Sequence, residues 1–474
     1  MKKIISGVLS AVMLTSALCA CNDGGNQSNS SQLGNNADSS QQTVTTDVAT
    51  TQPATEPNYE DTNYVAPIPP KNQTYKFEEI SLEEAATSSG YSATDSKFKI
   101  YYAWTEGEYL IVDVTYSDEK AADYCKYDVI YDLDGNMIAN ISNVSLNEGY
   151  DKSVEIKGIY KDYVILSLKN SADSKNKYAL YNFKTEKIKY IDSQYDYAYL
   201  NRGAITVSKD FKYGALDLNL NEIIPVEYEQ LLIASPDRFI ALKGNYYGLI
   251  DFDNNVVADF KYKQICSFNG LGCDDGSIKQ LDFENNINQY TVAIDKNQKS
   301  VLIDKNGSIV NDNLETTADK LNYSGRIVAQ YGDKTFITYG NSISDTNGNM
   351  IIEGVVDDYC CSGYINGYCL TKDKNGNYEL VDTKGTVIYQ TTHDTEYNTK
   401  ITPVDQSGLF MVDYYSKDDS NYMRTEILDL AGNIVYTTQE GGFSSMGNGL
   451  FSRHDNEPHS LENEGYALYK VAAE

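Results

Sequence analysis

Four short stretches place oxygen-bearing side chains at alternating positions, a pattern that can bind a calcium ion. They are Asp132/Asp134/Asn136, Asp251/Asp253/Asn255, Asp345/Asn347/Asn349 and Asp373/Asn375/Asn377. None of them supplies the Gly at position six or the Glu at position twelve of an EF-hand. Asp and Asn are also favoured in tight turns, because their side chains accept hydrogen bonds from the nearby backbone. We therefore interpret the four stretches as turns and expect no cofactor, with calcium binding as the alternative.

The sequence contains few of the residues on which enzymes most often depend. Its three histidines are His393, His454 and His459, and it has no G-x-S-x-G, H-E-x-x-H or P-loop motif. A glycosidase needs only two carboxylates at a suitable separation, and 68 acidic residues leave that alternative open. We assign no catalytic, cofactor-binding or metal-binding residues and expect a protein that is not an enzyme.

Six cysteines follow residue 21 and offer a choice between disulfides and free thiols. They are Cys125, Cys266, Cys273, Cys360, Cys361 and Cys369. Zinc sites usually combine paired C-x-x-C units, which this spacing does not provide. If the protein is exported, Cys266 can pair with Cys273, and Cys369 with Cys360 or Cys361. The alternative is that the thiols are free and buried.

Residues 1–20 have the organisation of a signal peptide. Lys2 and Lys3 precede an apolar run from Ile4 to Leu18, which is short for a membrane span. The ending Leu18-Cys19-Ala20-Cys21 resembles the lipobox of bacterial lipoproteins. This resemblance implies cleavage after Ala20 and lipidation of Cys21, which would anchor an extracytoplasmic body to the cell membrane without spanning it. An ordinary secretory signal is the alternative.

Residues 21–72 are predicted to form a disordered tether behind the lipidated cysteine. Ser, Thr, Asn, Gln, Gly and Pro dominate this segment, and no Lys or Arg occurs between Lys3 and Lys71. Such a composition cannot bury enough apolar surface to offset the entropy lost on ordering. The folded domain is therefore expected at residues 73–474, at the cell surface or in the envelope.

The strongly acidic composition limits the partners. The formal net charge is −29, and removal of residues 1–20 deletes two lysines and no acid. Phosphate backbones and anionic lipid headgroups repel such a body, so we expect no nucleic-acid partner and membrane contact through the lipid anchor only. A protein or a glycan is the expected partner.

From residue 73 onward the pattern is that of antiparallel β-hairpins. Strand-length apolar runs end in an Asp that is followed three residues later by a Gly, which suits a hairpin turn. Five copies keep both residues and three keep only the Asp or Asn. The five are Asp132 with Gly135, Asp304 with Gly307, Asp345 with Gly348, Asp382 with Gly385 and Asp429 with Gly432, and the three are Asn182, Asp217 and Asp251.

The spacing of these eight turns predicts an all-β propeller of about eight blades. Successive turns lie about 42 residues apart, the length of a four-stranded blade. An open solenoid or two β subdomains are the alternatives, but a closed ring protects strand edges. We expect the end segments Tyr75–Glu79, Lys97–Trp104, Leu450–Arg453 and Tyr466–Val471 to pair as one composite blade that closes the ring.

Two copies resemble the WG repeat of bacterial proteins. Tyr213-Gly214-Ala215-Leu216-Asp217 and Tyr247-Gly248-Leu249-Ile250-Asp251 are each followed, eleven residues after the Asp, by a Tyr, although Tyr replaces the family's Trp. The resemblance implies a β-rich protein with a binding or scaffold role.

The leading hypothesis is a lipid-anchored, non-catalytic binding module for a protein or glycan. The alternatives are a carbohydrate-active enzyme with a carboxylate pair and an envelope assembly scaffold. Tyrosine is abundant, with 41 copies. Pairs such as Tyr101-Tyr102 and Tyr414-Tyr415 can stack on sugars or anchor proteins, but we favour the interpretation that they fill strand faces and the interfaces between blades. We expect a local functional site, if the protein has one, to lie in the insertions between Asp251 and Asp304 and between Asp382 and Asp429.

Overall fold

The chain divides into two units, Met1–Asn58 and Tyr59–Glu474, and the computed structural model describes part of the second. The described residues are 64–82, 98–117, 124–146, 154–169, 176–268, 288–312, 314, 328–339, 342–355, 363–391, 397–417, 422–439, 443–454 and 466–474. The fold, the contacts and the site below are those of these residues.

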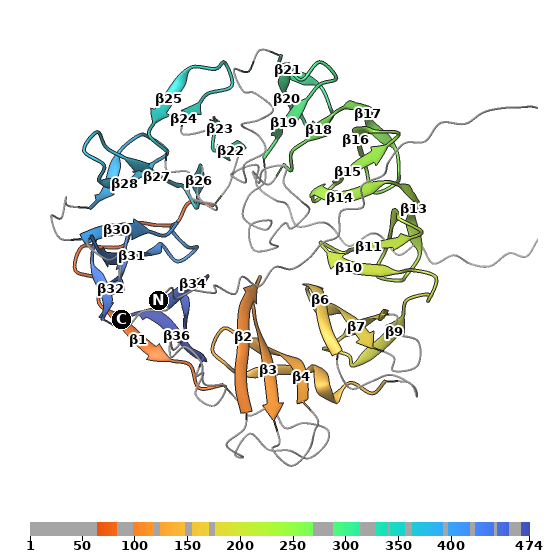
Figure 1. Ribbon diagram of the computed structural model, residues 1–474, viewed down its shortest axis with the longest axis horizontal. Coiled ribbons are helices and arrows are strands. Elements are labelled where there is room, and N and C mark those ends of the chain that lie inside the picture. The colour runs from red at the N-terminus through yellow and green to blue at the C-terminus, as the bar shows by residue number, and fades with distance from the viewer. Residues whose placement is uncertain are drawn as a thin grey trace, which may run out of the picture. The chain divides into compact units, whose positions relative to one another are not determined.

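The second unit is an all-β propeller of nine antiparallel blades, each with four strands (Figure 1). In Figure 1 the first strand of a blade, such as β14 or β22, lies nearer the ring centre than the fourth, such as β17 or β25. The predicted propeller is therefore confirmed, with one blade more than the predicted number of about eight. Apart from the three-residue 3-10 helix η1 (Ile141–Asn143), no helix occurs among the described residues.

Eight blades are continuous in sequence. The first four are β2 (Phe98–Glu106), β3 (Tyr109–Ser117), β4 (Tyr124–Asp132), β5 (Met137–Asn140); β6 (Val154–Tyr160), β7 (Tyr163–Lys169), β8 (Asn176–Asn182), β9 (Lys187–Tyr190); β10 (Tyr197–Asn201), β11 (Ala204–Lys209), β12 (Lys212–Leu216), β13 (Glu222–Tyr228); and β14 (Gln230–Ser235), β15 (Arg238–Lys243), β16 (Tyr246–Ile250), β17 (Val256–Tyr262). The next four are β18 (Gln264–Ile265), β19 (Tyr290–Ile294), β20 (Ser300–Asp304), β21 (Ile309–Asn311); β22 (Val328–Tyr331), β23 (Lys334–Tyr339), β24 (Ser342–Ser344), β25 (Met350–Glu353); β26 (Tyr364–Ile365), β27 (Tyr368–Lys372), β28 (Tyr378–Asp382), β29 (Val387–Gln390); and β30 (Tyr397–Ile401), β31 (Leu409–Ser416), β32 (Tyr422–Asp429), β33 (Ile434–Thr438).

The ninth, composite blade joins the two ends of the second unit. Its strands are β34 (Phe443–Gly447), β35 (Leu450–His454), β36 (Tyr466–Ala473) and β1 (Tyr75–Glu79), and β1 pairs antiparallel with β36. Phe77 on β1 stacks between Tyr469 of its own blade, at 5.0 Å, and Tyr436 of the preceding blade, at 4.0 Å. The predicted composite blade is confirmed, except that Phe98–Trp104, the described part of the expected segment Lys97–Trp104, belongs to β2 of the next blade.

The hydrophobic core lies between blades, because alternate residues of a strand face opposite neighbours. On β3, Ile111 packs with Val154 and Ile156 of the following blade, whereas Leu110 packs with Leu450 and Leu468 of the composite blade. Each strand in the middle of a blade is thus apolar on both faces. This explains the continuous apolar runs in the sequence.

The predicted Asp turns connect the third and fourth strands of all eight continuous blades. In a representative turn, Asp345 Oδ1 accepts hydrogen bonds from the amides of Asn347 and Asn349, both at 2.8 Å, and the Gly348 amide donates to the Asp345 carbonyl at 3.1 Å. Gly348 has a φ of 84°. Where the Gly is missing, another residue takes the left-handed conformation, namely Glu186, Leu220 or Asn254.

The Tyr-Gly motif of two copies is explained by strand packing. Tyr213 faces Tyr228 across β12 and β13, and a β-bulge follows in the register. A Cβ on Gly214 would lie 2.6 Å from the carbonyl oxygen of Ile224, so β13 approaches too closely for a side chain. Tyr247, Gly248 and Tyr262 repeat the arrangement in the next blade. The motif therefore fixes the bulge, as expected for packing residues.

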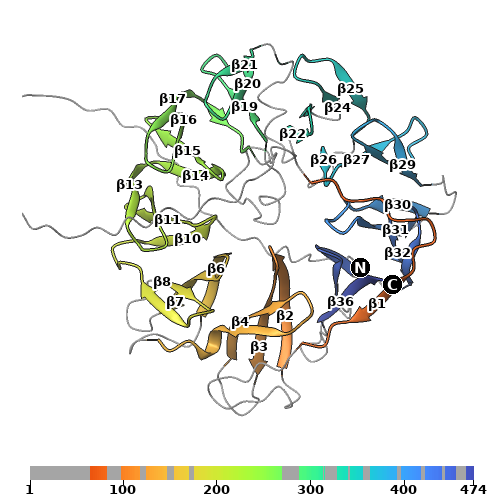
Figure 2. The same cartoon turned by 180° about the vertical axis from the view of Figure 1, so that it is seen from behind.

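A strap formed by Tyr64–Pro70 precedes β1 and crosses two blades (Figure 2). Ala66 is fully buried, its amide donates to the carbonyl of Asn366 at 2.9 Å, and its carbonyl accepts from the Tyr368 hydroxyl at 2.8 Å. Pro70 accepts from the side chain of Asn433 at 3.1 Å. These contacts begin before residue 73, where the sequence places the boundary between tether and domain.

Two predictions fall partly on undescribed residues. Cys266 is disulfide-bonded to a cysteine whose side chain is not described, whereas Cys369 is free and buried, as the free-thiol alternative expects. The insertions expected to carry function lie largely at 269–287, 392–396 and 418–421, outside the described residues.

No helix in the described part of the chain has the length and apolarity to span a membrane.

Candidate binding surface

The four Asp and Asn stretches have the geometry of hydrogen-bonded turns. In each of them the first Asp accepts two backbone amides through Oδ1 and the side-chain amide of the last Asn through Oδ2, as Asp251 does with Asn255 at 2.9 Å. Burial raises the pKa of Asp345, but the hydrogen bonds from Asn349 and Asn347 outweigh it and hold the pKa below its ordinary value. No cluster of three metal-ligating side chains occurs among the described residues.

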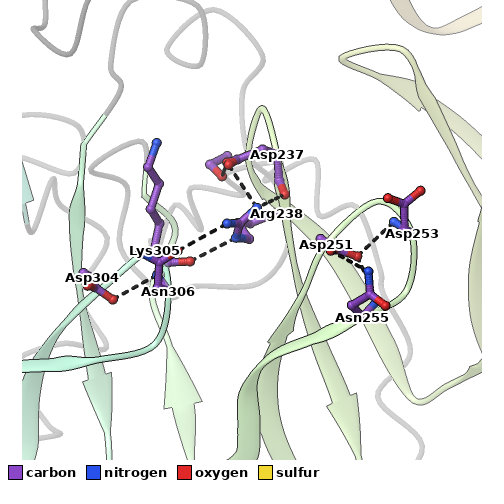
Figure 3. Close-up of polar contacts among 9 residues, drawn as sticks. Asp237, Arg238, Asp251, Asp253, Asn255, Asp304, Lys305 and Asn306 are labelled. Atoms are coloured by element: carbon purple, nitrogen blue, oxygen red, sulfur yellow. Dashed lines mark hydrogen bonds and ion pairs between the residues drawn. The ribbon is translucent and has the colours of Figure 1, made fainter. Parts of the chain in front are cut away.

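Arg238 anchors the junction between blades β14–β17 and β18–β21 (Figure 3). Its Nε donates to the carbonyl of Lys305 at 3.0 Å, and its Nη2 lies 3.5 Å from the Asn306 side-chain oxygen. Its Nη1 pairs with the Asp237 carboxylate at 3.0 Å. Only 16% of the Arg238 side chain is exposed, so this cluster joins a turn of one blade to the next and is not a ligand site.

One pair of carboxylates lies in register on adjacent strands. Asp113 on β3 faces Asp128 on β4, and each is 5% exposed. The amide of Ile156 on β6 donates to Asp128 Oδ2 at 2.7 Å, so the pair contributes to the contact between two blades. A glycosidase pair must reach its substrate. The burial of Asp113 and Asp128 therefore supports a packing role.

An aromatic pair, in which Tyr102 is exposed and Trp104 is partly buried, lies on β2, the innermost strand of the first continuous blade. The rings of Tyr102 and Trp104 are stacked with centroids 5.8 Å apart and planes inclined by 26°, and 54% of Tyr102 is exposed. Trp104 packs on the core beneath, and its Nε1 lies 3.5 Å from Glu106 Oε2. Glu106 in turn accepts the Ile159 amide at 3.1 Å. These contacts hold the aromatic face rigidly.

A second set of tyrosines lies on β10, the innermost strand two blades further on. Tyr197 is 39% exposed and makes an edge contact of 6.4 Å with Tyr178. Burial raises the pKa of Tyr197 to about 12, and burial followed by the charge of Glu106 raises the pKa of Tyr199. Both phenols therefore stay protonated at neutral pH and can donate hydrogen bonds.

Charged groups lie on the innermost strand between these two sets. On β6, Lys157 and Glu155 form an ion pair of 3.0 Å whose side chains are 39% and 37% exposed. Burial raises the pKa of Tyr178, and the charges of Asp196 and Glu155 add to the rise, whereas a hydrogen bond with Asn176 opposes it. Three consecutive blades thus present aromatic and charged side chains from their innermost strands. We call Tyr102, Trp104, Glu155, Lys157, Tyr197 and Tyr199 the inner aromatic surface.

The structure distinguishes between the tyrosine pairs singled out in the sequence. Tyr102 is exposed, contrary to the favoured expectation that such rings fill strand faces, and the side chain of Tyr101 is not described. Tyr414 instead lies under the Arg424 guanidinium at 4.0 Å and donates to Glu426 at 2.9 Å, so it belongs to strand packing. Trp104, Tyr197 and Tyr199 are not among the residues that the sequence suggested for binding. The pattern that could have identified them is the alternation of aromatic residues along the first strand of a blade.

Comparisons with known proteins assign neither a family nor a function to the chain. No family model and no curated protein matches it. Among solved structures, "Crystal structure of the eukaryotic initiation factor" matches with 11% identity and a TM-score of 0.42, over 84% of this chain and 98% of that one. Porphyromonas gingivalis dipeptidyl peptidase 4 matches with 8% identity and a TM-score of 0.35, over 76% and 60%. The propeller domain of the Trilobed protease from Pyrococcus furiosus matches with 12% identity and a TM-score of 0.31, over 70% and 95%.

Proposed function

We propose that this protein is a membrane-tethered, non-catalytic module that binds a neutral glycan at the inner aromatic surface. The observation that carries the proposal is the exposed face of Tyr102, stacked on the only tryptophan of the chain, on an innermost strand. An aromatic face fixed in this way loses little conformational entropy when a ligand stacks on it.

The inner aromatic surface offers partners for both the apolar faces and the hydroxyl groups of a sugar ring. The C–H faces of a sugar are apolar and suit aromatic faces such as that of Tyr102. Its hydroxyl edges need donors and acceptors, which the Tyr197 phenol and the Glu155–Lys157 ion pair offer. A net charge of −29 disfavours anionic polymers, so a neutral glycan is the better candidate.

The predicted location outside the cell membrane also supports a glycan ligand. Cleavage after Ala20 and lipidation of Cys21 would tether the propeller to the outer side of the cell membrane, where glycans are abundant. Two or more acyl chains give a stable anchor, whereas one gives marginal binding. The tether in front of Tyr64 would set how far the propeller reaches from the lipid.

Tryptophan fluorescence tests the proposal, because Trp104 is the only tryptophan and reports on its own surroundings. The purified protein is titrated with soluble cello-, xylo- and chito-oligosaccharides. We expect a saturable change with at least one of them. Tyr102→Ala and Tyr197→Ala should each weaken the affinity about tenfold, because each removes one stacking or hydrogen-bonding partner.

Ile434→Ala is the matched control, since Ile434 is 60% exposed but lies on the outermost strand β33. It should leave the affinity unchanged. A saturable signal that is equal in the wild type and in Tyr102→Ala, or no signal with any neutral glycan, would contradict the proposal.

A further inference from the structure

Phe211 is the most exposed of the large apolar residues that the structure describes, with 95% of its surface accessible. It occupies the second position of the two-residue turn between β11 and β12, where Lys209 pairs with Lys212. The φ angles of Asp210 and Phe211 are 50° and 62°, as in a type I′ turn. Among the described residues, Phe211 is the only aromatic residue with a positive φ.

The equivalent turn of the next blade shows what the fold itself requires. There Gly244 and Asn245 join β15 to β16 with φ angles of 62° and 70°. Gly and Asn are the residues that such turns favour, because they adopt the left-handed conformation at low cost. A bulky side chain in this conformation is strained, and an exposed ring buries no apolar surface. Phe211 therefore contributes nothing to the turn that Asn would not provide at lower cost.

We propose that Phe211 is an anchor residue that inserts into an apolar pocket of a protein partner. The turn presents the ring rigidly, since the Asp210 amide donates to Asp196 Oδ2 at 3.3 Å. Large aromatic residues on rigid supports are typical hot spots of protein interfaces. The proposed glycan surface lies elsewhere, on the innermost strands, so this inference does not depend on it.

The charges around the ring indicate that the rim of the partner's pocket is basic. The nearby lysines are engaged, because Lys212 pairs with Glu229 at 2.6 Å and Lys209 donates to Gln194 at 3.0 Å. Asp210 precedes Phe211 in the turn, Asp196 accepts the Asp210 amide, and the whole chain carries a net charge of −29. Such a surface is attracted to a basic rim and repelled by anionic lipid.

The Phe211 turn and the strap lie on opposite faces of the ring. Turns from the second to the third strand lie on the opposite face of the ring from turns between the first and second strands, because the strands of a blade alternate in direction. The strap contacts the latter face, through Asn366 and through Gln406, whose carbonyl accepts the Tyr64 hydroxyl at 3.0 Å (Figure 2). Phe211 thus points away from the face on which the chain enters the domain.

Site-specific photocrosslinking followed by an affinity measurement tests the anchor. The full-length protein carries benzoylphenylalanine at position 211 or, as the matched control, at position 245, in cells that produce it naturally. The partner protein that crosslinks only at position 211 is then purified, and its affinity for the wild-type propeller protein is measured by titration. We expect Phe211→Asn to weaken the affinity about 30-fold or more, Asn245→Ala to change it less than twofold, and added salt to weaken it.

Phe211→Asn should also melt at the same temperature as the wild type or higher, because Asn tolerates the left-handed conformation. A lower melting temperature would assign Phe211 a structural role and overturn the proposal. Equal crosslinking at both positions, or no loss of affinity in Phe211→Asn, would also overturn it. So would binding to phosphatidylcholine–phosphatidylglycerol vesicles or self-association that depends on Phe211.

Discussion

The carboxylate of Asp405 accepts a hydrogen bond from the amide of Gly449 at 3.0 Å, and this bond joins blade β30–β33 to the composite blade. Asp405 also accepts the amides of Ser407 and Leu409 at 2.8 and 2.9 Å. Burial raises its pKa to about 6, although the hydrogen bonds from these backbone amides oppose the shift. The fold therefore favours the protonated form relative to the unfolded chain.

This shift predicts a specific dependence of stability on pH. Because the folded pKa lies above the ordinary value of 3.8, the contribution of Asp405 is complete below that value and is lost as the pH rises through about 6. The free energy of unfolding of the wild type relative to Asp405→Asn should fall by about 2 kcal/mol between pH 4.5 and pH 7.5. Urea unfolding at the two pH values measures it. A difference that does not change with pH would contradict the assignment.

Removal of β1 should open the ring. Deletion of residues 1–79 removes the strand that pairs with β36 and the stack of Phe77 between Tyr436 and Tyr469. We expect the melting temperature to fall by more than about 5 °C, because several kcal/mol of packing are lost. Deletion of residues 1–63 is the control and should leave it nearly unchanged. Equal melting of both variants would show that β1 does not close the ring.

Gly214→Ala should destabilise the protein through a backbone clash. The new Cβ would lie 2.6 Å from the Ile224 carbonyl oxygen, so β13 must move. We expect a loss of about 1–3 kcal/mol in the free energy of unfolding, measured with urea. Gly244→Ala is the comparison, because no atom lies within 4 Å of its Cβ and only the positive φ opposes the change. A smaller loss at Gly214 than at Gly244 would argue against the close approach.

Calcium should have little effect on the turns. Asp132, Asp251, Asp345 and Asp373 already accept hydrogen bonds from amides of their own turns. We expect the melting temperature to change by less than about 1 °C when 5 mM calcium replaces a chelator. A rise of many degrees would instead indicate that the ion displaces these amides and that the calcium alternative holds.

Replacement of Cys21 tests the proposed membrane tether. Cys21→Ala removes the thiol on which the proposed acylation depends, so we expect the protein to move from the membrane pellet to the soluble fraction. Immunoblotting of the two fractions measures the change. Cys19→Ala is the control and should remain in the pellet. A Cys21→Ala protein that remains in the pellet would contradict the lipobox interpretation.

The strands and turns follow from the amino-acid sequence alone, because they depend on local chemistry. The run Tyr109–Tyr116 predicts β3, and the Asp345-to-Gly348 spacing predicts a turn that is present, because both signals depend on neighbouring backbone groups. Eight such turns predicted about eight blades. The ninth blade has no such turn, because its third and fourth strands, β36 and β1, are at opposite ends of the folded unit.

Which aromatic side chains are available to a partner depends on the tertiary structure. Tyr102 and Tyr414 look alike in the sequence, yet the first is exposed on β2 and the second lies under Arg424. Phe211 carries no signal of its own in the sequence, whereas the structure places it in a two-residue turn with 95% of its surface exposed. Exposure depends on how neighbouring blades cover a side chain, and that covering is set by contacts between residues far apart in the chain.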